Sequence, residues 1–327
     1  MHGRSALVTG AGGFIGGHLV ARLVREGAKV RALCRYNSRN DRGTLDWLDA
    51  DVQAEVEVHL GELRDIESVS RAVGGTEVIF HLGAQIAIPY SYVNARDYFE
   101  TNVLGSLNVA QAALTHDVSR IVHTSTSEVY GTAQSVPITE EHPLEAQSPY
   151  AASKIGADKL MDSFHRTHEL PVVVLRPFNT FGPRQSARAV IPTIISQALT
   201  GSTLRLGSLD PRRDLTYVED TAAGFVAAAL AERAVGQTVQ LGTGTAVSVG
   251  EIVRMVGEIV GRELEVETDQ ARVRPAASEV QLLLSDPSRA RETCGWEPSV
   301  SLREGLERTV EWIDANQRRF RTGDYVI

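Results

Sequence analysis

The chain has 327 residues, of which 43% are hydrophobic and 23% are charged, and its formal net charge is −8. These are ordinary globular values, and they exclude a mostly disordered protein. The acidic balance argues against nucleic acid as a partner, because a polyanion is gripped by many basic side chains. At this length we expect one large domain carrying a smaller lobe, or two domains.

The cysteines and the lengths of the apolar runs indicate in which cellular compartment the protein is expected. Cys34 and Cys294 are far apart and lack metal-ligand spacing, so we expect neither a disulfide framework nor a metal site. The first apolar run, residues 6–9, is too short for a signal-peptide core. No apolar stretch approaches the roughly 20 residues of a membrane helix. We therefore expect a cytoplasmic protein that does not contact the membrane.

Buried strands and amphipathic helices alternate through the first half of the chain. The predicted strands span residues 5–9, 29–34, 55–59, 77–81, 120–125 and 171–175. The predicted helices, with apolar positions three and four residues apart, span 15–26, 66–73, 98–115 and 150–168. This rhythm predicts an α/β fold of the Rossmann type, a doubly wound parallel sheet covered by helices on both faces.

The alternation loosens after residue 175, where four prolines fall between positions 176 and 214. This composition suits a smaller substrate-binding lobe. A further helix over 216–230 and a strand over 238–241 are predicted to return to the sheet. We therefore expect a sheet-forming domain of residues 1–176 plus 215–243, and a smaller substrate-binding lobe of residues 177–214 plus 244–327.

A glycine motif joins the first strand to the first helix. Residues 9–16 read TGAGGFIG, and this position is what a dinucleotide fingerprint requires. Gly10 permits a tight turn, and Gly13 lets the backbone approach a pyrophosphate at the helix N-terminus. Gly16 allows close helix packing. The motif predicts a nicotinamide dinucleotide cofactor.

The end of the second strand discriminates between the two dinucleotides. An acidic residue usually binds the ribose diol of NAD there, but this chain has Cys34 followed by Arg35. A guanidinium can pair with the 2′-phosphate of NADP. Arg35 therefore favours NADP, with NAD as the alternative.

Tyr150 and Lys154 lie four residues apart on one predicted helix, so both side chains project from one face. The lysine is expected to lower the pKa of the tyrosine towards the working range. Thr126 and Glu128 precede this pair, directly after a predicted strand. Hydroxyl groups at that edge of the sheet can reach a bound substrate.

These motifs, in this order and over essentially the whole chain, resemble the extended short-chain dehydrogenase/reductase family in its NDP-sugar 4,6-dehydratase type. The resemblance implies that Thr126 holds the sugar 4-hydroxyl, Tyr150 removes its proton, and Lys154 supports the phenolate and the cofactor ribose. The cofactor would be tightly held and recycled within each turnover. The remaining cofactor contacts implied by the resemblance are Phe14, Ile15, Asp65, Ile66, Leu82, Ala84, Gln85, Thr124 and Pro177.

Glu128 is the residue that indicates which reaction the enzyme catalyses. The 4-epimerases of the family that this chain resembles usually lack a carboxylate at this position, whereas its dehydratases and UDP-glucuronate decarboxylases keep Thr-x-Glu. Oxidation at C4 acidifies the C5 proton, so this carboxylate can act as the base while water leaves from C6. Glucose-type dehydratases place Asp before this Glu, but here Ser127 stands there as in mannose-type enzymes. Glu128 would then shuttle the proton itself, or Ser127 would relay it.

Three later residues resemble the family's substrate contacts. Asn179 is expected to contact the diphosphate or sugar, and Arg213, within RDLTYVED, is expected to clamp the diphosphate. Arg274 resembles a late arginine that closes over the same phosphates. Decarboxylases tend to lack an Asp directly after the first of these arginines.

The resemblance also predicts a homodimer, which would pair through the helices over 98–115 and 150–168. Residues 86–92 and 179–193 are similar to dehydratases of the legionaminic-acid type, which act on NDP-N-acetylglucosamine. UDP-glucuronate decarboxylase and 4-epimerase remain alternatives within the family. A catalytically idle, cofactor-binding regulator is an alternative of another class, although Thr126, Glu128, Tyr150 and Lys154 argue against it.

Overall fold

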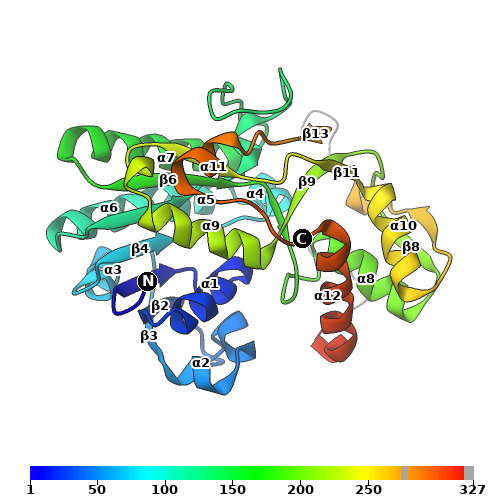
Figure 1. The fold of residues 1–327 in the computed structure, drawn as a ribbon, viewed down its shortest axis with the longest axis horizontal. Coiled ribbons are helices and arrows are strands. Elements are labelled where there is room, and N and C mark those ends of the chain that lie inside the picture. Colours follow the sequence, from blue (N-terminus) through cyan, green and yellow to red (C-terminus); the bar gives the residue numbers. More distant parts are fainter. Residues whose placement is uncertain (274–278, 320–327) are drawn as a thin grey trace.

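A seven-stranded parallel sheet forms the centre of the larger part of the molecule (Figure 1). The computed structural model describes residues 1–273 and 279–319. In the sheet the strands lie in the order β10-β6-β5-β4-β1-β2-β3. Their bounds are β1 Ser5–Thr9, β2 Lys29–Arg35, β3 Val56–Gly61, β4 Val78–His81, β5 Arg120–Thr124, β6 Val172–Pro177 and β10 Thr238–Leu241. Because every neighbouring pair is parallel, all the carboxyl ends meet at one edge.

Helices cover both faces of this sheet, because its strands are apolar on both sides. One face packs against α1 (Phe14–Arg25), α9 (Val218–Leu230) and α11 (Ser288–Cys294). The other packs against α3 (Ile66–Val73), α6 (Gly105–Thr115) and α7 (Pro149–His168). Alternation along β1 shows the principle: Ala6 and Val8 join the first core, while Leu7 joins the second. The predicted doubly wound α/β fold is confirmed.

The order of the strands creates a crevice. From β1 the chain continues to β2 and β3 on one side, and it then returns to β4 on the other side of β1. The connections after β1 and β4 therefore leave the sheet in opposite directions. In open parallel sheets, ligands bind at such a switch point, beyond the carboxyl ends of the strands.

The helix predicted over 98–115 is interrupted. It consists of α5 (Ala95–Phe99), a π-helical turn at Glu100–Leu104, and α6. Within the turn, Asn102 accepts a hydrogen bond from the backbone N–H of Gln85 at 2.8 Å and donates one to Ser153 Oγ at 2.8 Å. Such π-turns occur frequently at functional sites, and this one ties α7 to the loop after β4.

A smaller lobe has its own sheets and core. β9 (Arg212–Tyr217) pairs with β7 (Asn179–Phe181), β11 (Ala246–Ser248) and β13 (Leu282–Leu283), while β8 (Thr203–Leu206) pairs with β12 (Glu265–Thr268). Its helices are α8 (Val190–Thr200), α10 (Val249–Val260) and α12 (Leu302–Ala315), which gather at the right of Figure 1. β9 runs to Tyr217, so the helix predicted from 216 begins at Val218.

The remaining helical segments are short. They are η1 Gly43–Trp47, α2 Ala50–Ala54, α4 Ile88–Val93, η3 Ser127–Tyr130, η4 Glu232–Ala234, η5 Gln270–Arg272 and η7 Gln317–Arg319. Within residues 1–273 and 279–319, no helix has the length and apolar character needed to span a bilayer.

Candidate active site

A cavity of about 760 Å³ occupies the switch point at the carboxyl edge of the sheet. It brings together residues that are far apart in the sequence, from the glycine turn to the segment after β6. The predicted site residues that line it are Gly10, Gly13, Phe14, Ile15, Gly16, Arg35, Leu82, Ala84, Gln85, Thr124, Thr126, Ser127, Glu128, Tyr150, Pro177 and Asn179.

The glycine turn has the shape of a phosphate cradle. Gly10 has φ of 67°, and a Cβ there would lie 2.7 Å from the backbone nitrogen of Gly83. A Cβ on Gly16 would collide with the carbonyl oxygen of Gly10. α1 begins after Gly13 with no side-chain cap and no acidic residue in its first turn. Its N-terminal N–H groups therefore lie beside the cavity, as an anionic group of a dinucleotide requires.

The end of β2 is cationic at the cavity rim. Arg35 is exposed and lines the cavity. Cys34 is 5% exposed, and burial raises the pKa of its thiol, so it packs as a small apolar side chain. The loop after β2 adds Arg39 and Arg42 to the lining, which the sequence analysis missed. Arg42 is held by Asp46, with Nε 2.6 Å from Oδ1.

The tyrosine and the lysine are both buried beneath the cavity. Tyr150 is 8% exposed and hydrogen-bonds to Thr126. Lys154 Nζ donates to the carbonyl oxygen of Thr124 at 2.6 Å, and the residue lies behind the lining. Together these contacts hold α7 against the end of β5.

The two pKa values differ from the sequence expectation. Burial raises the pKa of Tyr150, the hydrogen bond with Thr126 opposes that rise, and the charge of Glu128 adds to it. Burial lowers the pKa of Lys154 to about 8. The pKa of Tyr150 therefore does not fall towards the working range in the protein by itself, because desolvation of the phenol is the largest effect.

Glu128 lies at the cavity beside Tyr150. It belongs to η3, where its backbone N–H donates to Thr126 Oγ1 at 3.3 Å. Its side chain is half-buried, it lines the cavity, and its charge acts on Tyr150. Ser127 lines the same cavity and is 3% exposed. A carboxylate, a phenol and two hydroxyl groups therefore surround one space.

Several buried polar atoms at the cavity have no hydrogen-bond partner among the described residues: Thr124 Oγ1, Asn179 Oδ1 and Gln185 Oε1. Unsatisfied buried polar atoms are costly, so a polar ligand would stabilise them. Gln185 was missed by the sequence analysis, because only the turn after β7, where Arg184 has φ of 69°, carries it to the cavity. Ile86 and Ile88 add an apolar wall.

Four predicted residues are not in the lining, and a fifth lies outside the described residues. Lys154 acts from behind it. Asp65 caps α3, accepting from the N–H of Glu67 at 3.1 Å, and Ile66 is 41% exposed. Arg213, on β9, donates to Glu279 Oε1 at 3.0 Å. Arg274 falls in the stretch that is not described.

No group of three or more His, Cys, Asp or Glu side chains suited to a metal occurs among residues 1–273 and 279–319.

Known proteins share this architecture. Residues 7–309 match the family model of GDP-mannose 4,6 dehydratase. The low-salt glycan biosynthesis protein Agl12 of Haloferax volcanii is 34% identical over 94% of this chain and 97% of its own length. A UDP-glucose 4-epimerase of Mycolicibacterium smegmatis is 33% identical over 94% and 97%. The crystal structure of DesIV, a dTDP-glucose 4,6-dehydratase of Streptomyces venezuelae with bound NAD, gives a TM-score of 0.85 at 31% identity, covering 97% of this chain and 98% of DesIV.

The parallel sheet, the glycine turn and the Tyr150–Lys154 pair define an extended short-chain dehydrogenase/reductase of the NDP-sugar dehydratase type. The chain belongs to the GDP-mannose 4,6 dehydratase family. Its relatives include 4,6-dehydratases and 4-epimerases at similar identity, so membership alone does not select the reaction.

Proposed function

We propose that this protein is an NDP-hexose 4,6-dehydratase, which converts a nucleotide-linked hexose into its 4-keto-6-deoxy derivative and water. The observation that carries the proposal is the half-buried carboxylate of Glu128, which lines the same cavity as the Tyr150 phenol. A 4-epimerase needs no base at C5, whereas water elimination does.

The cavity fits a nicotinamide dinucleotide, because a side chain on Gly10 or Gly16 would fill the cradle at the N-terminus of α1. Further contacts would come from Phe14, Ile15, Leu82, Ala84, Gln85, Thr124 and Pro177. When bound, the nicotinamide supplies the redox chemistry by accepting hydride from C4 of the sugar and returning it to C6. Arg35 at the rim favours NADP, although the related DesIV binds NAD.

Tyr150 would remove the proton from the 4-hydroxyl while Thr126 holds that oxygen. Its raised pKa is an obstacle, because a phenol that stays protonated is a poor base. Two cationic groups counter it, the ammonium of Lys154 and the positive charge of an oxidised nicotinamide, since opposite charge stabilises a phenolate. Lys154 is fixed by the carbonyl of Thr124, which aims its charge at the base of the cavity.

Glu128 would then take the proton from C5, which the neighbouring ketone has acidified. The proton count balances over the cycle: protons leave O4 and C5, one proton joins the departing 6-hydroxyl to form water, and one returns to C5. Glu128 would deliver its proton to the leaving hydroxyl, and Ser127, which lines the same cavity, is the alternative relay.

The substrate would be held by Asn179, whose Oδ1 has no partner among the described residues, and by Arg213 and Arg274 as phosphate ligands. Arg213 pairs with Glu279, so phosphate binding would require exchange of that partner. We assign dinucleotide binding to residues 1–176 plus 215–243 and nucleotide-sugar binding to residues 177–214 plus 244–327, of which α11 packs on the large sheet.

The alternative is 4-epimerisation, in which Tyr150 and Lys154 have the same tasks and Glu128 has none. It is favoured by the UDP-glucose 4-epimerase among the relatives. UDP-glucuronate decarboxylation is the other reaction available to a Thr-x-Glu site.

Product analysis separates these reactions. The purified protein is incubated with NADP or NAD and with a panel of UDP-, GDP- and dTDP-hexoses together with UDP-glucuronate, and the products are identified by NMR. We expect a 4-keto-6-deoxy sugar nucleotide from at least one substrate. The Tyr150→Phe variant, prepared identically, should form none, which excludes a contaminating enzyme. An epimer, or a pentose with loss of carbon dioxide, as the sole product would refute the dehydratase proposal.

A further inference from the structure

Asp158 lies on the catalytic helix but outside the cavity. It follows Tyr150 and Lys154 at intervals of four residues along α7, so the three side chains occupy successive turns of one face. Asp158 is 3% exposed. A carboxylate is seldom buried to this degree unless it is paired, and its partners show what it holds.

Both carboxylate oxygens face neighbouring strands, and Oδ2 makes the hydrogen bonds. Oδ2 accepts from Ser125 Oγ at 2.6 Å and from Arg176 Nη2 at 3.1 Å. Oδ1 lies 3.3 Å from His123 Nε2. Ser125 is the residue between Thr124, whose carbonyl binds Lys154, and Thr126, which hydrogen-bonds to Tyr150. Asp158 on α7 therefore binds Ser125, which lies between the two residues that Lys154 and Tyr150 contact.

We propose that Asp158 is a positioning residue, which fixes the register between α7 and the end of β5 and so sets the geometry of Tyr150 and Lys154 against Thr126 and Thr124. The proposal rests on the proposed use of Tyr150 and Lys154 for C4 oxidation. It does not depend on which reaction follows that oxidation.

The charge of Asp158 has a second effect on the same pair. Burial lowers the pKa of Lys154, and Asp158 opposes that change. The same negative charge raises the pKa of Tyr150. Asp158 itself stays ionised. Burial raises its pKa, but the pairing with His123 and Arg176 has the larger effect, so the pKa of Asp158 is lowered. The ionisable groups that face this carboxylate from α7, β5, β6 and η3 are His123, Tyr130, Tyr150, Lys154 and Arg176.

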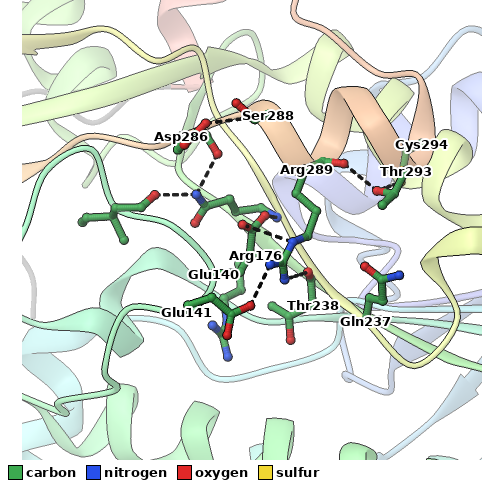
Figure 2. A network of polar contacts seen from close by, with 12 residues as sticks. Glu140, Glu141, Arg176, Gln237, Thr238, Asp286, Ser288, Arg289, Thr293 and Cys294 are labelled. Carbon is green, nitrogen blue, oxygen red and sulfur yellow. Dashed lines mark hydrogen bonds and ion pairs between the residues drawn. The ribbon is translucent and has the colours of Figure 1, made fainter.

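Arg176 is itself anchored, which gives the carboxylate a fixed partner. Its Nη1 donates to the Tyr130 hydroxyl at 3.1 Å. Arg176 and Asp158 also line a second, polar cavity of about 450 Å³, which shares no lining residue with the active-site cavity. Figure 2 shows Arg176 with Glu140, Glu141 and Arg289, which line the same cavity. Ion pairs there, such as Arg289 Nη2 to Glu141 Oε1 at 2.7 Å, hold this side of the sheet.

Two substitutions separate the effect of the Ser125–Asp158 hydrogen bond from the effect of the negative charge of Asp158. Ser125→Ala removes the 2.6 Å hydrogen bond but keeps the carboxylate, so it should lower kcat about ten-fold without moving the pH–rate profile. Asp158→Asn keeps the shape but removes the charge, which lowers the pKa of both Tyr150 and Lys154. Its whole profile should move about one unit towards lower pH, whereas a purely structural defect would lower the rate equally at every pH.

The control is Asp162→Asn, one turn further along α7, where the carboxylate is partly exposed and pairs with Arg166. It should change neither kcat nor the profile. Hydrogen exchange supplies a readout independent of activity: amides of residues 124–128 should exchange about five-fold faster in Ser125→Ala than in the control.

In these comparisons kcat means the rate constant of C4 oxidation at saturating substrate, which is followed as reduction of the bound cofactor after mixing. A wild-type protein that yields an epimer would overturn the dehydratase proposal and leave this comparison valid, because both reactions begin with that step. Wild-type kcat and wild-type exchange in Ser125→Ala would overturn the positioning role. An unmoved profile in folded Asp158→Asn would overturn the effect of its charge on Tyr150 and Lys154; if that variant does not fold, Ser125→Ala alone decides the positioning role.

Discussion

Acid should destabilise this fold, and His18 allows the size of the effect to be worked out. His18 is 8% exposed, and its Nε2 lies 2.9 Å from the carbonyl oxygen of Pro183, which joins α1 to the segment after β7. Burial lowers its pKa from 6.5 to about 4, with a smaller opposing effect of the Pro183 hydrogen bond. The unfolded chain therefore binds a proton between these two values while the folded chain does not.

The stability contributed by neutral His18 is fully present above pH 6.5 and is lost as the pH falls towards 4. At 1.36 kcal/mol per pKa unit, the free energy of unfolding should drop by about 2 kcal/mol between pH 7.5 and pH 5 from this residue alone. Burial lowers the pKa of His81 and His123 as well, so they add to the loss in the same direction.

Urea unfolding at the two pH values measures the loss, and His18→Gln isolates the contribution of His18. Glutamine keeps a donor for the Pro183 carbonyl but cannot titrate. The difference in unfolding free energy between pH 7.5 and pH 5 should be about 2 kcal/mol smaller in this variant than in the wild type. An equal pH dependence in the two proteins would refute the reasoning, because His18 would then not be neutral by burial.

The other predictions concern the cofactor and the assembly. Gly16→Ala places a methyl group against the carbonyl oxygen of the glycine turn, so dinucleotide affinity by calorimetry should fall at least about ten-fold; Gly201→Ala, which has open space, should bind normally, and equal affinities would contradict the cradle. Arg35→Ala should raise the dissociation constant for NADP more than that for NAD, and an equal effect on both would count against a 2′-phosphate contact. Phe99 and Leu104 are 44% and 50% exposed where we propose that two copies pair. Replacing both with Glu should therefore convert a dimer into a monomer in light scattering, and a monomeric wild type would exclude this pairing.

Local sequence patterns predicted the parts of the site that follow strand ends. The glycine motif after β1 and the Thr126–Glu128 segment after β5 line one cavity, because parallel strands bring their carboxyl ends to one edge. Tyr150 joins them because α7 packs against that edge. These positions depend on element type and order, which periodicity reveals.

Contacts between distant segments were not predictable in the same way. The bond from Asp158 to Ser125 spans 33 residues, and no periodicity marks it. The raised pKa of Tyr150 was not expected, because its largest cause is burial, which depends on the whole tertiary structure. Asp65 caps α3 instead of lining the cavity, since an aspartate before a helix satisfies its first N–H groups.

Replacement of the carboxylate at position 128 tests the central claim most directly. Glu128→Gln keeps the size of the side chain and leaves Tyr150 and Lys154 in place, so the variant should still bind the sugar nucleotide and oxidise C4. Without the base, elimination should stop. The absorbance of reduced nicotinamide should then build up after C4 oxidation and persist, because no acceptor for its hydride forms at C6. Glu145→Gln, an exposed carboxylate elsewhere, should turn over normally. Wild-type product formation by Glu128→Gln, with no accumulation of reduced cofactor, would contradict the account.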